Sequence, residues 1–134
     1  MRSRTLVRAT FALTIAAGLA ACGGSSSGGS GAGGSTSFND HGSKTVSGSS
    51  IDIEADNYYF EPSVITGKPG EKVTATIENE GSTEHNFTIE SQDIDEDIEA
   101  GKDTTVTVTM PQSGAVSFFC EYHKSQGMAG ELKG

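Results

Sequence analysis

The chain has 134 residues, of which 34% are hydrophobic and 20% are charged, and its formal net charge is −9. This length leaves room for one small domain with attached segments rather than for a large enzyme. The acidic balance excludes a protein that holds nucleic acid through Lys and Arg contacts with phosphates. Two cysteines allow one disulfide at most, which excludes a disulfide-dense miniprotein.

Residues 1–21 predict a secretory signal peptide. Three arginines lie within the first eight positions, and an apolar run follows from 9 to 20. That run is too short to span a bilayer as a helix. It ends in Leu-Ala-Ala-Cys at Cys22, which resembles a bacterial lipobox, and this resemblance implies cleavage before Cys22 and lipid attachment to it. The alternative is an ordinary signal peptide followed by an incidental cysteine.

Residues 22–50 predict the lipidated Cys22 followed by a flexible tether. Thirteen of the fifteen residues from 23 to 37 are Gly or Ser, and the polar character continues weakly to about Ser50. Such a segment buries too little apolar surface to offset the entropy of ordering it. We expect the side chain of His41 to be solvated, because no partner motif accompanies it. These features predict an exported domain, lipid-anchored on the extracytoplasmic face of the cell membrane.

Residues 51–134 predict one all-β domain. Segments 51–55, 73–77 and 106–110 alternate apolar and polar residues and are rich in Val, Ile and Thr. Further short strands are expected at 59–60, 64–66, 86–89, 115–119 and 130–133. Because no segment has convincing helical periodicity, the pattern predicts a β-sandwich or barrel of about seven or eight strands.

The C-terminal part of the domain contains a C-x2-H-x4-M pattern formed by Cys120, His123 and Met128. His85, at the start of a predicted strand, is the only other histidine in residues 51–134. One Cys, two His and one Met are the ligand types of a blue-copper site. Thiolate and thioether sulfurs suit Cu(I), whereas imidazoles suit both oxidation states. A zinc site is a weaker interpretation, because structural zinc prefers four Cys or His ligands.

The domain resembles the cupredoxins of the plastocyanin, pseudoazurin and halocyanin group from residue 51 to the end. The loop spacing C-x2-H-x4-M-x-G, the His85-Asn86 pair and the segments 60–62 and 67–70 carry this resemblance. It implies a Greek-key β-sandwich, the cupredoxin-like barrel, and one mononuclear type I copper ion.

The resemblance also implies roles for individual residues. His85, Cys120 and His123 correspond to the equatorial copper ligands, and Met128 corresponds to the axial ligand. Asn86 corresponds to a residue that ties its strand to the cysteine-bearing loop by hydrogen bonds.

We therefore expect a monomeric, membrane-tethered electron carrier that cycles copper between Cu(I) and Cu(II), and not an enzyme. Its partners would be donor and acceptor redox proteins, and electrons would pass through the edge of His123 within an apolar patch that includes Met128, Ala129 and Pro111. The acidic run from 93 to 99 is expected to be a solvated loop, with a docking patch as the alternative.

Two other functions remain open from the sequence. Extracytoplasmic copper capture and delivery is the main alternative, although the three methionines form no Met-rich tract. An immunoglobulin-like adhesion domain with coincidental ligand residues is the other.

Overall fold

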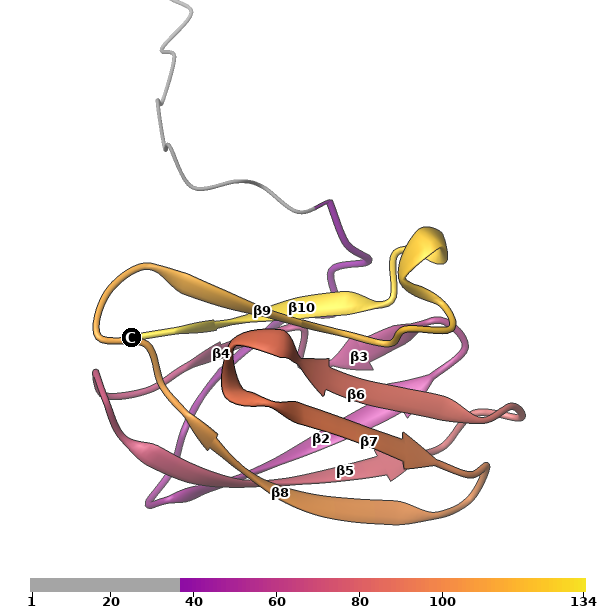
Figure 1. The fold of residues 1–134 in the computed structure, drawn as a ribbon, viewed down its shortest axis with the longest axis horizontal. Helices are drawn as coiled ribbons and strands as arrows, with labels where there is room; N and C mark the ends of the chain where they lie inside the picture. The colour runs from indigo at the N-terminus through magenta and orange to yellow at the C-terminus, as the bar shows by residue number, and fades with distance from the viewer. Residues whose placement is uncertain (1–36) are drawn as a thin grey trace, which may run out of the picture. The chain divides into compact units, whose positions relative to one another are not determined.

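The computed structural model describes residues 37–134, and the predicted signal peptide, Cys22 and the first part of the predicted tether lie outside them (Figure 1). The described residues form ten strands and two single-turn 3-10 helices, η1 (Glu90–Gln92) and η2 (Lys124–Gln126). In this range no helix has the length and apolar character needed to cross a membrane. The predicted all-β class is confirmed, with ten strands in place of seven or eight.

The strands form two sheets that lie one over the other (Figure 1). The six-stranded sheet has the order β1 (Ser43–Thr45), β4 (Val64–Thr66), β10 (Ala129–Lys133), β9 (Ala115–Phe119), β6 (His85–Ile89), β7 (Ile94–Ile98). The four-stranded sheet has the order β3 (Tyr59–Glu61), β2 (Ser50–Asp56), β5 (Lys72–Asn79), β8 (Asp103–Thr109). In β2, β5 and β8 the apolar positions of the alternating pattern are the buried ones, as expected for half-buried strands.

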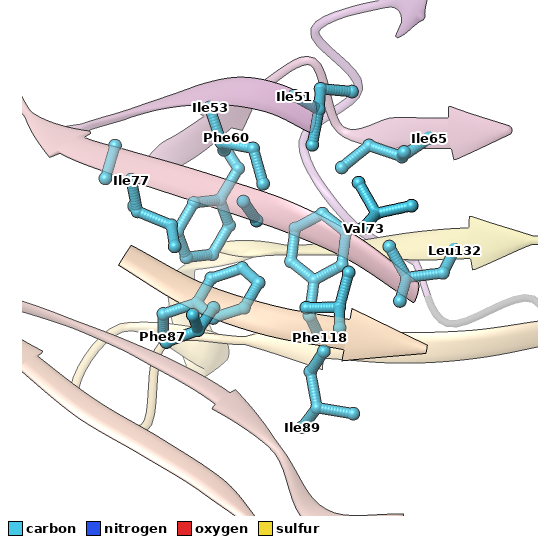
Figure 2. Close-up of a cluster of buried hydrophobic side chains, with 14 of the residues drawn as sticks. Ile51, Ile53, Phe60, Ile65, Val73, Ile77, Phe87, Ile89, Phe118 and Leu132 are labelled. Atoms are coloured by element: carbon cyan, nitrogen blue, oxygen red, sulfur yellow. The ribbon is translucent and has the colours of Figure 1, made fainter. Parts of the chain in front are cut away.

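Three phenylalanine rings join the two sheets at the centre of the core (Figure 2). Phe60 comes from the four-stranded sheet, whereas Phe87 and Phe118 come from β6 and β9 of the six-stranded sheet. Their ring centroids lie 5.2–5.7 Å apart, a spacing at which aromatic pairs attract one another. This cluster fixes β6 and β9 against the opposite sheet, and these two strands lead to the predicted metal ligands.

The folded domain begins earlier than the predicted boundary at residue 51. β1 pairs in parallel with β4, with Ser43 opposite Val64, although the sequence interpretation placed these residues in the tether. All three residues of β1 are exposed, so hydrogen bonds to β4 hold the strand and no hydrophobic alternation marks it. His41 is exposed as predicted, but its ring stacks on that of Tyr59 with 3.5 Å between centroids.

The acidic run that was predicted to be a loop contains the edge strand β7. This strand pairs in antiparallel fashion with β6, with Ile98 opposite His85 and Ile94 opposite Ile89. The acidic residues between the two isoleucines are exposed. Charged residues on an edge strand oppose its pairing with another chain. An edge strand can therefore have an acidic sequence of the kind that is also typical of a solvated loop.

Candidate metal centre

Three of the predicted ligands come together at one end of the sandwich. His85 opens β6, Cys120 follows β9, and His123 lies in the loop that leads to β10. The Nδ1 atom of His85 is 3.2 Å from Nδ1 of His123, and the Cys120 sulfur is 3.6 Å from that same atom. One potential ligand atom of each residue lies within 4.8 Å of the others. His85 and Cys120 are fully buried, whereas His123 is half-buried.

The chain between Cys120 and Met128 forms a compact loop that its own backbone holds closed. The Cys120 amide donates to the carbonyl of Met128 at 3.0 Å, and the Lys124 amide donates to the carbonyl of Cys120 at 2.8 Å. Gly127 ends η2 with a φ of 88°, a left-handed conformation that glycine adopts without strain. Met128 is fully buried, and the hydrogen bond from the Cys120 amide places its backbone beside that of Cys120.

The surroundings of His85 favour a neutral imidazole. Burial lowers the pKa of His85, and the nearby charge of His123 lowers it further. A neutral ring keeps a free electron pair for a metal ion. Two imidazole nitrogens and one thiol sulfur lie close enough together for a single cation to contact all three. This donor set, with one soft sulfur and two borderline nitrogens, fits copper.

Asn86 connects β6 to the segment that carries Cys120. Its backbone amide donates to the Cys120 sulfur at 3.3 Å, and its side-chain oxygen accepts a hydrogen bond from the Glu121 amide at 3.3 Å. β6 and β9 pair directly only at Thr88 and Phe119, so these contacts continue the connection where the regular ladder stops. Hydrogen bonds to a ligand atom and to its neighbours limit the movement of that ligand, as supporting contacts around metal sites do.

The side-chain nitrogen of Asn86 extends the network to the acidic edge strand. It donates to Asp95 Oδ1 at 2.7 Å and to Asp97 Oδ1 at 3.1 Å. Asp97 also accepts a hydrogen bond of 2.6 Å from the hydroxyl of Tyr122, the residue before His123. This bond raises the pKa of Tyr122 to about 12, and the bonds from Tyr122 and Asn86 lower the pKa of Asp97. β7 is therefore coupled to the first part of the ligand loop in two ways, through Asn86 and directly through Tyr122.

Sequence reasoning did not assign two aromatic residues that lie at the site. The ring of Tyr58 packs against His123 with 4.4 Å between centroids and meets His85 edge-on at 6.3 Å. Tyr122 is 50% exposed and lies beside His123. The sequence carries no spacing signal for Tyr58, because its contact with His123 joins residues 65 positions apart.

The residues expected to form an apolar patch around His123 do not form one. Met128 is fully buried and Ala129 is 5% exposed, so neither offers much surface to a partner. Pro111 follows β8 and lies next to Gly134, beyond the end of β10 that is remote from the site (Figure 1). The side chains found around the half-buried edge of His123 are instead those of Tyr58 and Tyr122.

Asn86→Asp is expected to destabilise the domain although it hardly changes the shape of the side chain. The variant loses the donor for Asp95 and Asp97 and places a third carboxylate beside them, so the free energy of unfolding should fall by about 1.5–3 kcal/mol. Urea unfolding of the copper-free protein at neutral pH measures this. Adding Asp95→Asn to this variant reverses the donor and the acceptor and should restore part of the lost stability. A double variant no more stable than Asn86→Asp would contradict the hydrogen bond from Asn86 to Asp95.

Comparisons with known proteins agree with the fold and the donor set. The cupredoxin-like domain family matches residues 32–132. Plastocyanin A/B of Petroselinum crispum is 30% identical over 83 residues, which cover 54% of this chain and 84% of that protein. Reduced auracyanin of Roseiflexus castenholzii has the same fold, with a TM-score of 0.54 and 18% identity over 66% of this chain and 98% of its own.

A second solved structure with a similar fold is a domain of a metal-exporting ATPase. The metal-binding domain of the Cu(I)-exporting P-type ATPase of Streptococcus pneumoniae, solved with Cu(I), has a TM-score of 0.57 and 17% identity. The alignment covers 71% of this chain and 97% of that domain. The family match spans most of the chain and the donor set fits copper. The chain therefore belongs to the cupredoxin-like domain family, and the cofactor predicted from its sequence, one type I copper ion, is the cofactor of that family.

Proposed function

We propose that this protein is a blue-copper electron carrier that cycles between Cu(I) and Cu(II) while it is tethered to a membrane. The observation that carries the proposal is the convergence of two imidazole nitrogens and one thiol sulfur within 4.8 Å in a cupredoxin-like domain. Family membership and the plastocyanin relatives favour electron transfer over catalysis. In this proposal the protein is a monomer, and its partners are redox proteins.

The proposal assigns four residues to the copper ion. His85, Cys120 and His123 would hold it through two imidazole nitrogens and one sulfur, and Met128 would add a thioether sulfur. Bound copper would supply the exchange of one electron. The protein's part is to keep the ligand positions nearly the same in both oxidation states, which the Asn86 contacts and the hydrogen bonds within the loop support. Electrons would enter and leave through the half-buried ring of His123, flanked by Tyr58 and Tyr122.

The attachment to the membrane is part of the same proposal. Residues 1–21 would direct export, and lipid on Cys22 would anchor the domain through the Gly/Ser-rich segment that follows. The anchor keeps a small carrier close to redox partners in or near the membrane. The protein would then act on the extracytoplasmic face of the cell.

The test loads the full chain with Cu(II) and follows its visible absorption. An intense band that ascorbate bleaches and an oxidant restores, over repeated cycles with one copper ion per chain, would support the carrier function. Mass spectrometry of the membrane fraction checks in parallel for lipid on Cys22.

Copper release separates the carrier from a delivery protein. The reduced protein is mixed with a limiting amount of a Cu(I) chelator, and copper retention is measured in both oxidation states. A carrier keeps its ion in both states. A protein that remains colourless with Cu(II) yet binds Cu(I) and releases it readily would overturn the proposal in favour of copper delivery.

A further inference from the structure

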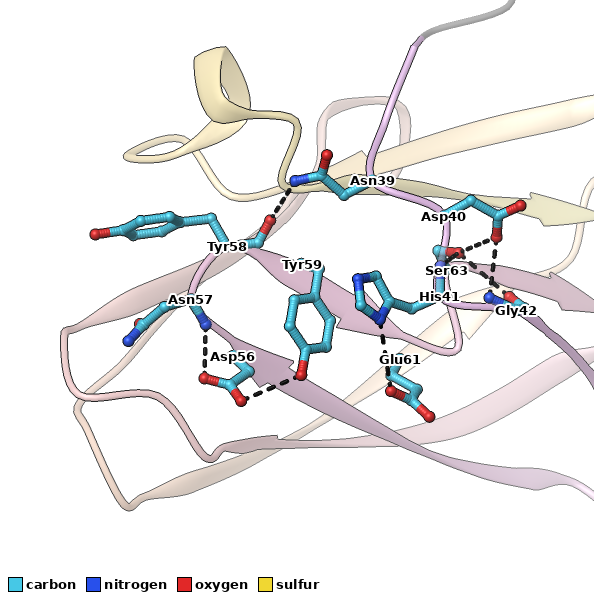
Figure 3. Close-up of polar contacts among 10 residues, drawn as sticks. All are labelled: Asn39, Asp40, His41, Gly42, Asp56, Asn57, Tyr58, Tyr59, Glu61 and Ser63. Carbon is cyan, nitrogen blue, oxygen red and sulfur yellow. Dashed lines mark hydrogen bonds and ion pairs between the residues drawn. The ribbon is translucent and has the colours of Figure 1, made fainter.

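The segment before β1 is fastened to the domain through a buried serine (Figure 3). We call residues 39–42 the N-terminal strap. Ser63 is fully buried, and its hydroxyl donates to Asp40 Oδ1 at 2.9 Å and accepts from the His41 amide at 2.8 Å. The amides of Ser63 and Val64 both donate to the Gly42 carbonyl, at 3.1 and 3.0 Å. The strap is thus part of the folded domain, although its sequence predicted a flexible tether.

The first residue of the strap is bonded to the loop that carries the predicted ligands. The Asn39 amide donates to the Gly127 carbonyl at 2.9 Å, and the Asn39 side-chain nitrogen donates to the Gln126 carbonyl at 2.9 Å. A Cβ atom on Gly127 would come within 2.8 Å of Asn39 Oδ1, so the two segments are in close contact. Gln126 and Gly127 lie between His123 and Met128.

The same nitrogen of Asn39 also bonds to the segment that carries Tyr58. It donates to the Tyr58 carbonyl at 2.8 Å, as Figure 3 shows. The ring of Tyr58 packs on the imidazole of His123. One amide group therefore links the ligand loop to the residue that covers the half-buried ligand.

We propose that Asn39 is a positioning residue for the metal centre. Its hydrogen bonds hold the loop from Cys120 to Met128, and the Tyr58 ring, in place around His123. This inference rests on the proposed copper site and adds that the segment next to the tether stabilises it. Between Cys120 and Met128 the chain forms no strand, only the short helix η2. Hydrogen bonds from other segments therefore limit the opening of this loop. Loss of the side-chain bonds of Asn39 frees the loop while leaving every ligand present.

The test compares Asn39→Ala with a matched control in the full chain. Gln92→Ala also removes an amide side chain that bonds to a backbone carbonyl of another segment, that of Thr109, at the far end of β8. In Asn39→Ala, the Cu(I) form should pass copper to a chelator about five- to tenfold faster, the factor expected from losing two exposed hydrogen bonds. The visible band of the Cu(II) form should shift, and Gln92→Ala should leave both unchanged.

Two further measurements keep the inference separate from the proposed function. In copper-free protein, the amide hydrogens of Lys124 and Gly127, which are bonded within the loop, should exchange about five- to tenfold faster in Asn39→Ala. Asn39→Asp, which has the same shape but lacks the donor, should behave like Asn39→Ala or worse. If amide exchange and copper release are unchanged in both variants, the positioning role of Asn39 is wrong. If the wild-type protein shows no visible band but Asn39→Ala still exchanges its loop amides faster, only the proposed function is wrong.

Discussion

Cys120→Ser is expected to abolish the intense visible band of the Cu(II)-loaded protein. The band arises when charge moves from a thiolate sulfur to copper, and a serine hydroxyl offers neither a soft donor nor a negative charge at neutral pH. The structure places the Cys120 sulfur 3.6 Å from His123 Nδ1 and within reach of His85. Copper affinity should fall by more than about 100-fold, because the loss of a residue that only supports a ligand already costs 10–100-fold.

Absorption spectra and competition with a copper chelator measure both effects. Cys22→Ser is the matched control, since it removes the other cysteine of the chain and should leave the band unchanged. Thermal unfolding of the copper-free proteins checks that the fold survives the change from sulfur to oxygen. A Cys120→Ser protein that retains the band, or a Cys22→Ser protein that loses it, would place the copper thiolate elsewhere.

Phe118→Ala is expected to lower the free energy of unfolding by about 3–5 kcal/mol, the usual cost of removing a buried aromatic ring. Phe118 is fully buried, and its ring lies 5.3 Å from that of Phe60 in the opposite sheet and 5.2 Å from that of Phe87. The cavity left between the sheets cannot close easily, because strands from both sheets line it. The loss is a large share of the 5–15 kcal/mol that is typical of domain stability.

Urea unfolding of the copper-free protein measures this change. Ser117→Ala, at the neighbouring exposed position of β9, should change the free energy by no more than about 0.5 kcal/mol. If Phe118→Ala does not fold, Phe118→Leu provides a milder variant whose loss should be smaller but measurable. A loss below about 1 kcal/mol for Phe118→Ala would mean that the three-ring cluster does not hold the sheets together.

The strands that the sequence predicted well are those that bury one face. β2, β5 and β8 alternate apolar and polar residues, and the β2–β5 and β5–β8 pairings run over most of these strands. β1 and β7 were missed because they lie at the two edges of the six-stranded sheet, where each pairs with one neighbour and most of its residues are exposed. Such strands need no hydrophobic alternation, so their sequences resemble a tether and an acidic loop.

The sequence by itself determined the chemistry of the centre, because Cys120, His123 and Met128 lie in one short loop whose spacing and residue types indicate copper. Only the tertiary structure decided what surrounds that loop. His85 meets His123 because the two sheets fix β6 beside the loop, and Asn39 and Tyr58 reach the loop from segments more than sixty residues away. Contacts over such separations depend on strand order and register, which local sequence patterns do not encode.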